Sequence, residues 1–433
     1  MTNSNDDYRR DALPRRVLLL LTSRSYRTRA FIEAAERLGI EVVKAVDMQE
    51  HLADYWNYPL GLDYSNVEKA AASIRSYSMN HPLGAILSVD DSGTLLAAVA
   101  NESLGLPHNS PKAASAARDK YRMRQLLEAC PVNSPNFKLH TISEDLSELF
   151  LLKIAKSTPY PCVVKPLSLS GSRGVIRANN EDEFVSANRR LIRLLAHVEP
   201  GTDSKSILVE DFVPGFEVAL EGILDDGELT VMALFDKPDP LDGPYFEETI
   251  YVTPSRLSPD IQESIFSSVS IAAKALGLRE GSIHAELRVN KDGPWLIEMA
   301  GRSIGGLCSH TLRFADENTL EELILRQAFG MEFVSLKRED QASGVMMLPI
   351  PGAGLLKRVE GCAEAEAVPF VEKVEITARL NYSLKPLPEG DSYLGFIFAR
   401  GHTPEEVEEA LRSAQKKLKF AIAPELSLIS SPV

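Results

Sequence analysis

The chain has 433 residues, 44% of them hydrophobic and 25% charged, a composition typical of a soluble globular protein with two or three domains. Its formal net charge of −14 argues against a protein that mainly neutralises nucleic-acid phosphates or lies on an anionic membrane, although it allows a local basic pocket. Four scattered cysteines without a CxxC pair favour a reducing, cytoplasmic location.

The first hundred residues alternate short apolar runs with helical patterns. Strands are predicted at 17–21, 40–47 and 85–91, with helices between them and up to Leu104. This rhythm predicts a parallel sheet covered by helices on both faces. The run at 17–21 is too short to cross a membrane, so no transmembrane segment is expected. The loop at 22–25 lacks the GxGxxG pattern of a dinucleotide site.

A change of pattern follows near residue 110. Ser110 and Pro111 are typical of a helix cap and first helical position, and one helix is predicted from there to just before Pro131. Between residues 161 and 298, short β patterns are separated by Gly and Asp turns, with one helix near 261–277. The last hundred residues predict a small α+β part, in which Thr403 and Glu406 form a capping box.

The stretch PCVVKPLSLSGSRGV places Lys165 on a buried strand and follows it with a Ser/Gly loop at 168–174. Small residues let backbone amides approach an anion, and the lysine adds a positive charge. The spacing is not that of a P-loop. Phosphate binding is one interpretation; an ordinary Gly/Ser turn after a strand is the other.

The stretch SILVEDFVPGFEVALEGIL runs into Glu210, breaks at Pro214-Gly215 and resumes with Glu217. The break is expected to free backbone groups at 211–213 to hydrogen-bond the edge of a flat ring, while Glu217 accepts bonds from sugar hydroxyls. A solvated strand, turn and strand is the equally open alternative.

The stretches SIHAELRV and PWLIEMA predict a hairpin with Glu286 on its polar face. If Lys291, Asp292 and Gly293 form the turn, Glu286 stands directly opposite Glu298. Like charges at that distance repel each other, so a cation between them is expected, and carboxylate pairs suit magnesium. Two alternatives remain: a two-residue turn that shifts the register, or two solvated acids on an exposed hairpin.

Two nearby residues have competing interpretations. His284 on the same strand is either a hydrogen-bonded structural residue or part of a site. Arg302, in the flexible stretch GRSIGG, either forms a surface salt bridge or reaches a developing negative charge.

Taken together, the sequence resembles the ATP-grasp superfamily, and within it the L-amino-acid ligases and their biotin-carboxylase-like relatives. The resemblance covers about residues 110 to 310. It rests on the order and spacing of SPKAASAARDKYRMRQLL, VVKPLSLSGSRGV, LVEDFVPGFE, FDKPDPLDGPYFEETIYVTPSRL, HAELRV and LIEMAGRSIGG.

The resemblance implies three domains with a mixed fold, α/β and α+β. They are a pre-ATP-grasp parallel α/β domain at 1–110, an ATP-grasp domain at 111–335 with a lid subdomain at about 158–235, and a carboxy-terminal α+β domain at 336–433.

The resemblance also implies roles for individual residues. Arg302 and Lys165 are catalytic, with Arg302 stabilising the acyl phosphate and the tetrahedral species, and Glu286 and Glu298 bridge magnesium ions to phosphates. On the substrate side lie Glu248, His284, Gly305 and Gly306. The nucleotide is held by Lys120, Lys165, Ser168, Ser170, Gly171, Ser172, Gly174, Glu210, Asp211, Val213 and Glu217.

The implied activity is an ATP-dependent carboxylate–amine ligase that uses Mg²⁺, for which Mn²⁺ can substitute, and releases ADP and phosphate. Amino acids are the expected substrates, and relatives of this kind are often dimers. A purine-pathway glycinamide ligase or carboxylase is the same-class alternative; a catalytically silent nucleotide-binding protein is the different-class one. Ala300 departs from the family, which often has asparagine two residues after the second metal glutamate.

Overall fold

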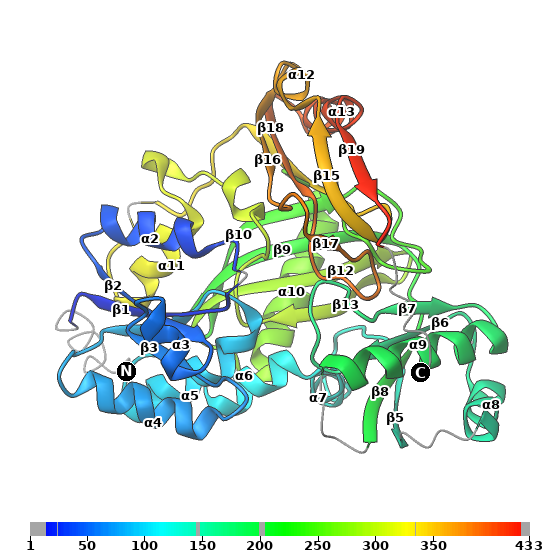
Figure 1. Cartoon of the computed structure of the whole chain (residues 1–433), viewed down its shortest axis with the longest axis horizontal. Helices are drawn as coiled ribbons and strands as arrows, with labels where there is room; N and C mark the ends of the chain where they lie inside the picture. Colours follow the sequence, from blue (N-terminus) through cyan, green and yellow to red (C-terminus); the bar gives the residue numbers. More distant parts are fainter. Residues whose placement is uncertain (1–13, 24, 144–147, 199–203, 334, 426–433) are drawn as a thin grey trace, which may run out of the picture.

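The computed structural model describes residues 14–23, 25–143, 148–198, 204–333 and 335–425. Figure 1 shows an amino-terminal α/β part in blue, a lid in cyan to green at the lower right, a long sheet through the middle and a carboxy-terminal part in orange and red. The predicted mixed architecture, with a parallel amino-terminal sheet, is confirmed. The domain boundaries near residues 110 and 335 stay predictions.

The amino-terminal part is a four-stranded parallel sheet in the order β3-β2-β1-β4. Its central strand β1 is buried on both faces, because Val17 and Leu19 join one core while Leu18 and Leu20 join another. The strands and helices of this part are β1 (Arg16–Leu21), α2 (Thr28–Arg37), β2 (Glu41–Asp47), α3 (Glu50–Tyr55), β3 (Leu60–Leu62), α4 (Val67–Ser78), β4 (Ala85–Ser88) and α5 (Thr94–Leu104).

Two helices connect this part to the rest, where one was predicted. Ser110 caps α6 (Pro111–Arg118) by accepting the Ala113 N–H, as expected. Asp119 then leaves the helical region (φ −99°, ψ 106°) and caps α7 (Lys120–Leu127) by accepting the Arg122 N–H. The prediction of a single helix is therefore wrong, and the break places Lys120 at the first position of a new helix.

The lid is a four-stranded sheet in the order β5-β8-β6-β7, covered by two helices. The longer helix packs its apolar face, including Phe184 and Leu191, on the strands. The elements are β5 (Phe137–Ser143), α8 (Glu148–Ser157), β6 (Cys162–Pro166), β7 (Ile176–Ala178), α9 (Glu181–Val198) and β8 (Ser204–Asp211).

An eight-stranded sheet, in the order β13-β12-β9-β10-β11-β14-β18-β16, joins the central and carboxy-terminal parts. Its β9-β10 hairpin turns at Asp226 and Gly227, which both have positive φ (48° and 86°), as the Asp-Gly pattern predicts. The elements in chain order are β9 (Phe216–Asp225), β10 (Glu228–Lys237), β11 (Ile250–Thr253), α10 (Pro259–Leu276), β12 (Gly281–Asn290), β13 (Gly293–Ala300), β14 (Ala342–Leu348), β16 (Val371–Ile376) and β18 (Gly395–Gly401).

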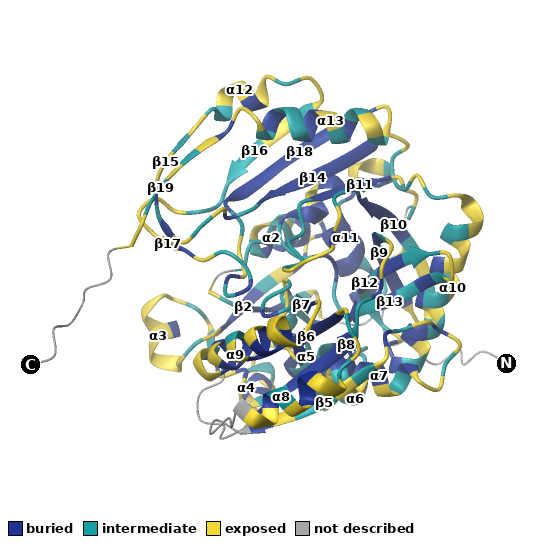
Figure 2. Cartoon of the chain, turned by 90° about the vertical axis from the view of Figure 1, so that its right-hand side faces the viewer, coloured by how far each residue is buried: buried dark blue, intermediate teal, exposed yellow. Residues whose placement is uncertain are grey.

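The carboxy-terminal part adds a three-stranded sheet in the order β17-β15-β19. Figure 2 shows β14 and β18 buried beneath α13, whose outer face is exposed. The remaining elements are α11 (Leu320–Ala328), β15 (Gly354–Glu360), α12 (Cys362–Glu366), β17 (Ser383–Leu384), α13 (Pro404–Gln415) and β19 (Lys419–Ala423). Among the described helices, none has the length and apolar character needed to cross a membrane.

Candidate active site

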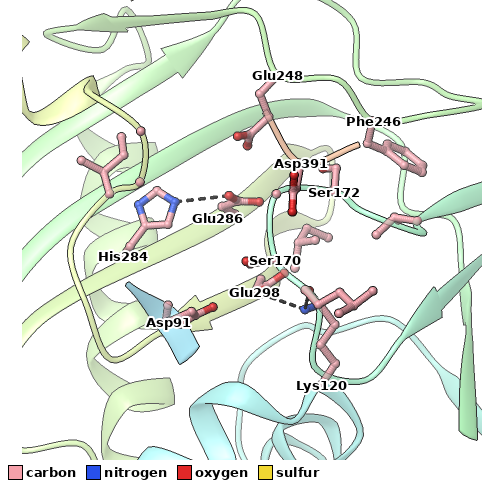
Figure 3. Close-up of a pocket in the computed structure, with 18 of the residues that line it drawn as sticks. Asp91, Lys120, Ser170, Ser172, Phe246, Glu248, His284, Glu286, Glu298 and Asp391 are labelled. Atoms are coloured by element: carbon pink, nitrogen blue, oxygen red, sulfur yellow. Dashed lines mark hydrogen bonds and ion pairs between the residues drawn. The ribbon is translucent and has the colours of Figure 1, made fainter. Parts of the chain in front are cut away.

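One cavity of about 530 Å³ lies where the four parts meet, and Figure 3 draws its walls. It brings together sixteen of the residues singled out from the sequence. The two that do not line it, Ser168 and Gly174, flank the loop residues that do. The sixteen are Lys120, Lys165, Ser170, Gly171, Ser172, Glu210, Asp211, Val213, Glu217, Glu248, His284, Glu286, Glu298, Arg302, Gly305 and Gly306.

The β12-β13 hairpin pairs Glu286 with Glu298 as predicted, but by a different route. Asn290 pairs with Gly293, so the turn has two residues, and the predicted three-residue turn is wrong. The register shifts between Glu286 and Leu287, which leaves Ile297 as an extra residue. With the two-residue turn alone, Glu298 would lie on the apolar face of the hairpin. The bulge shifts the register by one residue and places Glu298 on the polar face.

The two opposed carboxylates bind different cations. Glu298 accepts a hydrogen bond from Lys120 Nζ at 3.0 Å. Glu286 lies 3.2 Å from His284 Nε2 and 3.6 Å from Lys237 Nζ. Figure 3 shows the Lys120–Glu298 and His284–Glu286 contacts at separate places in the cavity. Burial alone would raise the pKa of Glu286, but the Lys237 ammonium and the His284 imidazole hold it below its ordinary value.

Lys237 is a buried cation that the sequence reasoning missed. Its Nζ lies 2.9 Å from Glu217 and 2.5 Å from Glu248, in addition to the contact with Glu286. Although burial favours the neutral amine, the surrounding carboxylates raise the pKa of Lys237. The available signal was a lysine at the end of an apolar strand, in the run FDKPDP.

The carboxylates around Lys237 have the chemistry of a divalent-cation site. Oxygens of Glu217, Glu248 and Glu286 lie within 4.8 Å of one another. Magnesium prefers oxygen ligands and commonly takes one or two carboxylates together with substrate phosphates. The residues present therefore fit a magnesium ion bound with a nucleotide.

A second buried ion cluster lies at the lid side of the cavity. Glu210 binds Lys165 Nζ at 2.5 Å and Arg124 Nε at 2.8 Å, and all three side chains are at most 5% exposed. Burial favours protonation of Glu210, but the two cations outweigh it and hold its pKa below the ordinary value. Arg124 is a further residue that the sequence reasoning missed.

Removing the Glu210 carboxylate is expected to destabilise the fold. Glu210→Ala leaves Arg124 and Lys165 as buried cations without a counter-charge, which costs about 3–5 kcal/mol of unfolding free energy. Urea denaturation followed by circular dichroism measures the change. As a matched control, Glu360→Ala removes an acid that is 52% exposed and paired with Arg358, and is expected to cost at most about 1 kcal/mol. Similar losses for both variants would contradict the prediction.

The backbone at 211–213 is less free than predicted. The Asp211 N–H donates to Asn136 O at 3.0 Å, and the Phe212 N–H donates to Pro161 O at 3.1 Å. The Val213 carbonyl accepts from Arg288 Nη1 at 2.9 Å. The expectation that the strand break leaves backbone groups unpaired is thus wrong for these three groups, the N–H of Asp211 and of Phe212 and the carbonyl of Val213. Asp211 and Val213 still line the cavity.

Arg302 contacts the amino-terminal part of the chain. Its Nε lies 3.3 Å from Asp91, and its Nη1 donates to Ser303 O at 2.8 Å. Burial alone would lower the pKa of Arg302, but Asp91 and Glu298 raise it. Asp91 had no signal in the sequence, since it is an acid at the end of the strand predicted at 85–91, some two hundred residues before Arg302.

The carboxy-terminal part also reaches the cavity, through the segment between β17 and β18. Asp391 lines the wall and binds Arg173 of the lid loop at 3.3 Å. The Gly174 N–H donates to Pro388 O at 2.9 Å. Arg190 of α9 binds the next residue, Glu389, through two hydrogen bonds of 2.5 and 2.7 Å. The lid is thus fastened to this segment beside the cavity.

Comparison with known families agrees with this geometry. The ATP-grasp domain family matches residues 158–311, and the ATP-grasp N-terminal domain family matches residues 32–108. The family described as L-amino acid ligase C-terminal domain 2 matches residues 346–423. The three matches follow one another along the chain, and most of the residues that line the cavity fall within them.

Individual relatives carry ligase names. The alanine–anticapsin ligase of Bacillus subtilis strain 168 is 27% identical over 62% of this chain, which spans 60% of that ligase. Dapdiamide A synthase of Enterobacter agglomerans is 24% identical over 74% of this chain and 73% of its own length.

Solved structures share the whole fold. The L-amino acid ligase from Bacillus licheniformis has a TM-score of 0.77 and 25% identity, covering 94% of this chain and 98% of that one. The biotin carboxylase domain of the Hydrogenobacter thermophilus 2-oxoglutarate carboxylase was solved with MgADP. It has a TM-score of 0.65 over 94% of this chain and 91% of that one. At 19% identity, this similarity shows a shared fold only. With consecutive family matches and a shared whole-chain fold, the chain belongs to the ATP-grasp family of carboxylate–amine ligases.

Proposed function

We propose that this protein joins two L-amino acids into a dipeptide at the expense of ATP, through an acyl phosphate, with release of ADP and phosphate. The observation that carries this proposal is the convergence of Lys120, Lys165, Glu286, Glu298 and Arg302 on one cavity. Cations for phosphates, carboxylates for a metal and an arginine for a developing anion are the groups that phosphoryl transfer to a carboxylate requires.

The nucleotide would occupy the lid side of the cavity. Lys120 and Lys165 supply positive charge for its phosphates, and the loop at 168–174 covers them with small residues. The backbone at Asp211 and Val213, with the Glu210 carboxylate, would hold the adenine, and Glu217 the ribose. Glu210, Asp211, Val213 and Glu217 all line the cavity, as do residues 169–172 of the loop.

Magnesium, or manganese in its place, would be held by Glu286 and Glu298, near Glu217 and Glu248. When bound, the ion neutralises phosphate charge and orients the transferred group. The Lys237 ammonium would reduce the repulsion between the buried carboxylates of Glu217, Glu248 and Glu286.

The proposed reaction has two steps. A substrate carboxylate oxygen attacks the γ-phosphorus of ATP, and the bond from that phosphorus to ADP breaks. The amine nitrogen of the second amino acid then attacks the carbonyl carbon, the bond to phosphate breaks, and the nitrogen loses a proton. The protein needs no nucleophile of its own, because it acts by positioning and charge neutralisation.

The substrates would lie on the far side of the carboxylates. Glu248 would bind the first substrate's amino group, and His284, Gly305 and Gly306 would border the reacting carboxylate. Arg302 would stabilise the acyl phosphate and the tetrahedral species that follows. A homodimer and a cytoplasmic location stay predictions.

A screen for ADP release with the amino acids in pairs tests the proposal. ADP and phosphate in equal amounts, with a dipeptide identified by mass spectrometry, are the expected products. Release of AMP and pyrophosphate would contradict the mechanism. Turnover only with phosphoribosylamine plus glycine, or with bicarbonate, would assign the chain to a purine-pathway ligase or a carboxylase instead.

A further inference from the structure

Glu221 is a buried acid to which the proposed reaction gives no role. It lies on β9 and has no exposed surface. A carboxylate this deep is costly unless both of its oxygens are paired. Its side chain does not line the cavity, and it stands directly opposite His284 in the register of β9 and β12.

The first oxygen of Glu221 binds His284. Oε1 pairs closely with Nδ1 of the imidazole, and Nε2 of the same ring lies 3.2 Å from Glu286 Oε1. The ring therefore lies between a fully buried acid and an acid of the cavity wall, with one nitrogen facing each of them.

The second oxygen of Glu221 binds the stretch that carries Arg302. Oε2 accepts the backbone N–H of Ile304 at 3.0 Å. Glycines at 301, 305 and 306 flank this stretch and leave its backbone free to adopt other conformations. The Ile304 side chain is 2% exposed, so the carboxylate and the core hold the same residue.

We infer that Glu221 is a positioning residue which, through His284, aims the Glu286 carboxylate at the metal and, through Ile304, holds the backbone from which Arg302 extends. The inference rests on the proposed metal role of Glu286. Partners behind a metal ligand commonly fix its orientation, and their loss typically lowers metal affinity or activity about 10- to 100-fold.

Lys237 is the competing support for Glu286. Its Nζ is 3.6 Å away and is already bound by Glu217 at 2.9 Å and Glu248 at 2.5 Å. His284 is nearer to Glu286, at 3.2 Å, and is held from behind by Glu221. The contribution of His284 is therefore separable by substituting it while Lys237 stays in place.

The test measures Mn²⁺ binding by electron paramagnetic resonance, in the presence of a non-hydrolysable ATP analogue and without amino acids. Glu221→Gln keeps the side-chain shape but offers one acceptor oxygen to two donors. It is expected to raise the Mn²⁺ dissociation constant about 10- to 100-fold, as is His284→Gln. Because the two residues act through one path, the double variant is expected to match the weaker-binding single variant.

Asp236→Asn provides the matched control. Asp236 is also fully buried in the central sheet, on β10, and it pairs with Ser255 and Arg256 outside the cavity. The control is expected to lower the thermal unfolding midpoint without changing the Mn²⁺ dissociation constant. A purely structural role for Glu221 would make its variant behave like this control.

Unchanged Mn²⁺ affinity in folded Glu221→Gln would overturn the inference, and so would losses that add in the double variant. If Glu221→Gln does not fold, the His284→Gln variant is the test. An unchanged Mn²⁺ affinity in that variant would contradict the proposed role of His284 and overturn the inference. Mn²⁺ binding could weaken in the variants as expected while the wild-type protein releases no ADP with any pair of amino acids. That result would support the positioning role of Glu221 and contradict the proposed ligase activity.

Discussion

Glu298→Gln is expected to lower kcat for ADP release about 100- to 1,000-fold while leaving the fold intact. The amide keeps the size of the side chain and can still accept from Lys120, but it loses the negative charge needed at the metal. Metal ions contribute several kcal/mol of charge stabilisation, and each 1.4 kcal/mol is a factor of ten in rate. Steady-state kinetics with a coupled ADP assay, together with thermal unfolding, measure both effects.

The control lies on the same hairpin. Asp292→Asn removes an exposed acid at the turn, far from the cavity lining, and is expected to leave kcat unchanged. Wild-type turnover by Glu298→Gln at saturating Mg²⁺ would count against the proposed metal role. A loss caused by unfolding would instead appear as a lower unfolding midpoint.

Arg302→Lys is expected to lower kcat about 100-fold or more with little change in the KM for ATP. The lysine keeps a positive charge, but it lacks the planar guanidinium that would bind the proposed acyl phosphate through two hydrogen bonds. In the structure, Arg302 Nε lies 3.3 Å from Asp91. Removing one donor to a developing oxyanion typically costs 100- to 1,000-fold in kcat.

The split between the two kinetic constants identifies the step at which Arg302 acts. A rise in the KM for ATP with an unchanged kcat would show that the arginine binds nucleotide and does not stabilise the reaction's charge. Arg313→Lys, at a residue that is 45% exposed and paired with Glu372, is the matched arginine control and is expected to change neither constant.

The Glu286–Glu298 pair illustrates what a local pattern can and cannot predict. Alternation along β12 indicated its polar face, and this was confirmed, whereas on β13 the alternation breaks at Ile297 and Leu296 lies in the apolar core. The predicted three-residue turn was wrong, because the turn has two residues and a bulge at Ile297 restores the pairing of Glu286 with Glu298. The Ile297 carbonyl accepts a hydrogen bond from Arg124 Nη2 at 2.5 Å. That donor comes from α7, more than 170 residues earlier, so no window around the hairpin contains this contact.

Two of the cavity residues missed by sequence reasoning share one physical reason. Asp91 comes from the amino-terminal part and Asp391 from the carboxy-terminal part. Neither lies in a motif, and each reaches the wall because separate domains pack together. Lys165, Glu210 and Arg302 could be predicted because their neighbours in the sequence already mark strand ends and glycine-rich turns.

The fold itself was largely readable from the sequence, since periodicity and caps are local. Two elements that were not predicted are the helix α9 (Glu181–Val198), where only the helix near 261–277 was expected between residues 161 and 298, and the strand β3 (Leu60–Leu62), where helix was expected. The single helix predicted after Ser110 was also wrong, since Asp119 interrupts a run of good helix formers. The Asp119 side chain, which can cap a helix, was the only sequence signal for this break.

The contacts between the lid and residues 388–391 connect catalysis to a distant part of the chain. For the loop at 168–174 to swing away from the cavity, Arg173 has to leave Asp391 and the Gly174 N–H has to leave Pro388. The pair of Arg190 and Glu389 resists the same movement through α9. Opening of this loop would therefore break contacts between residues that lie some two hundred positions apart in the chain.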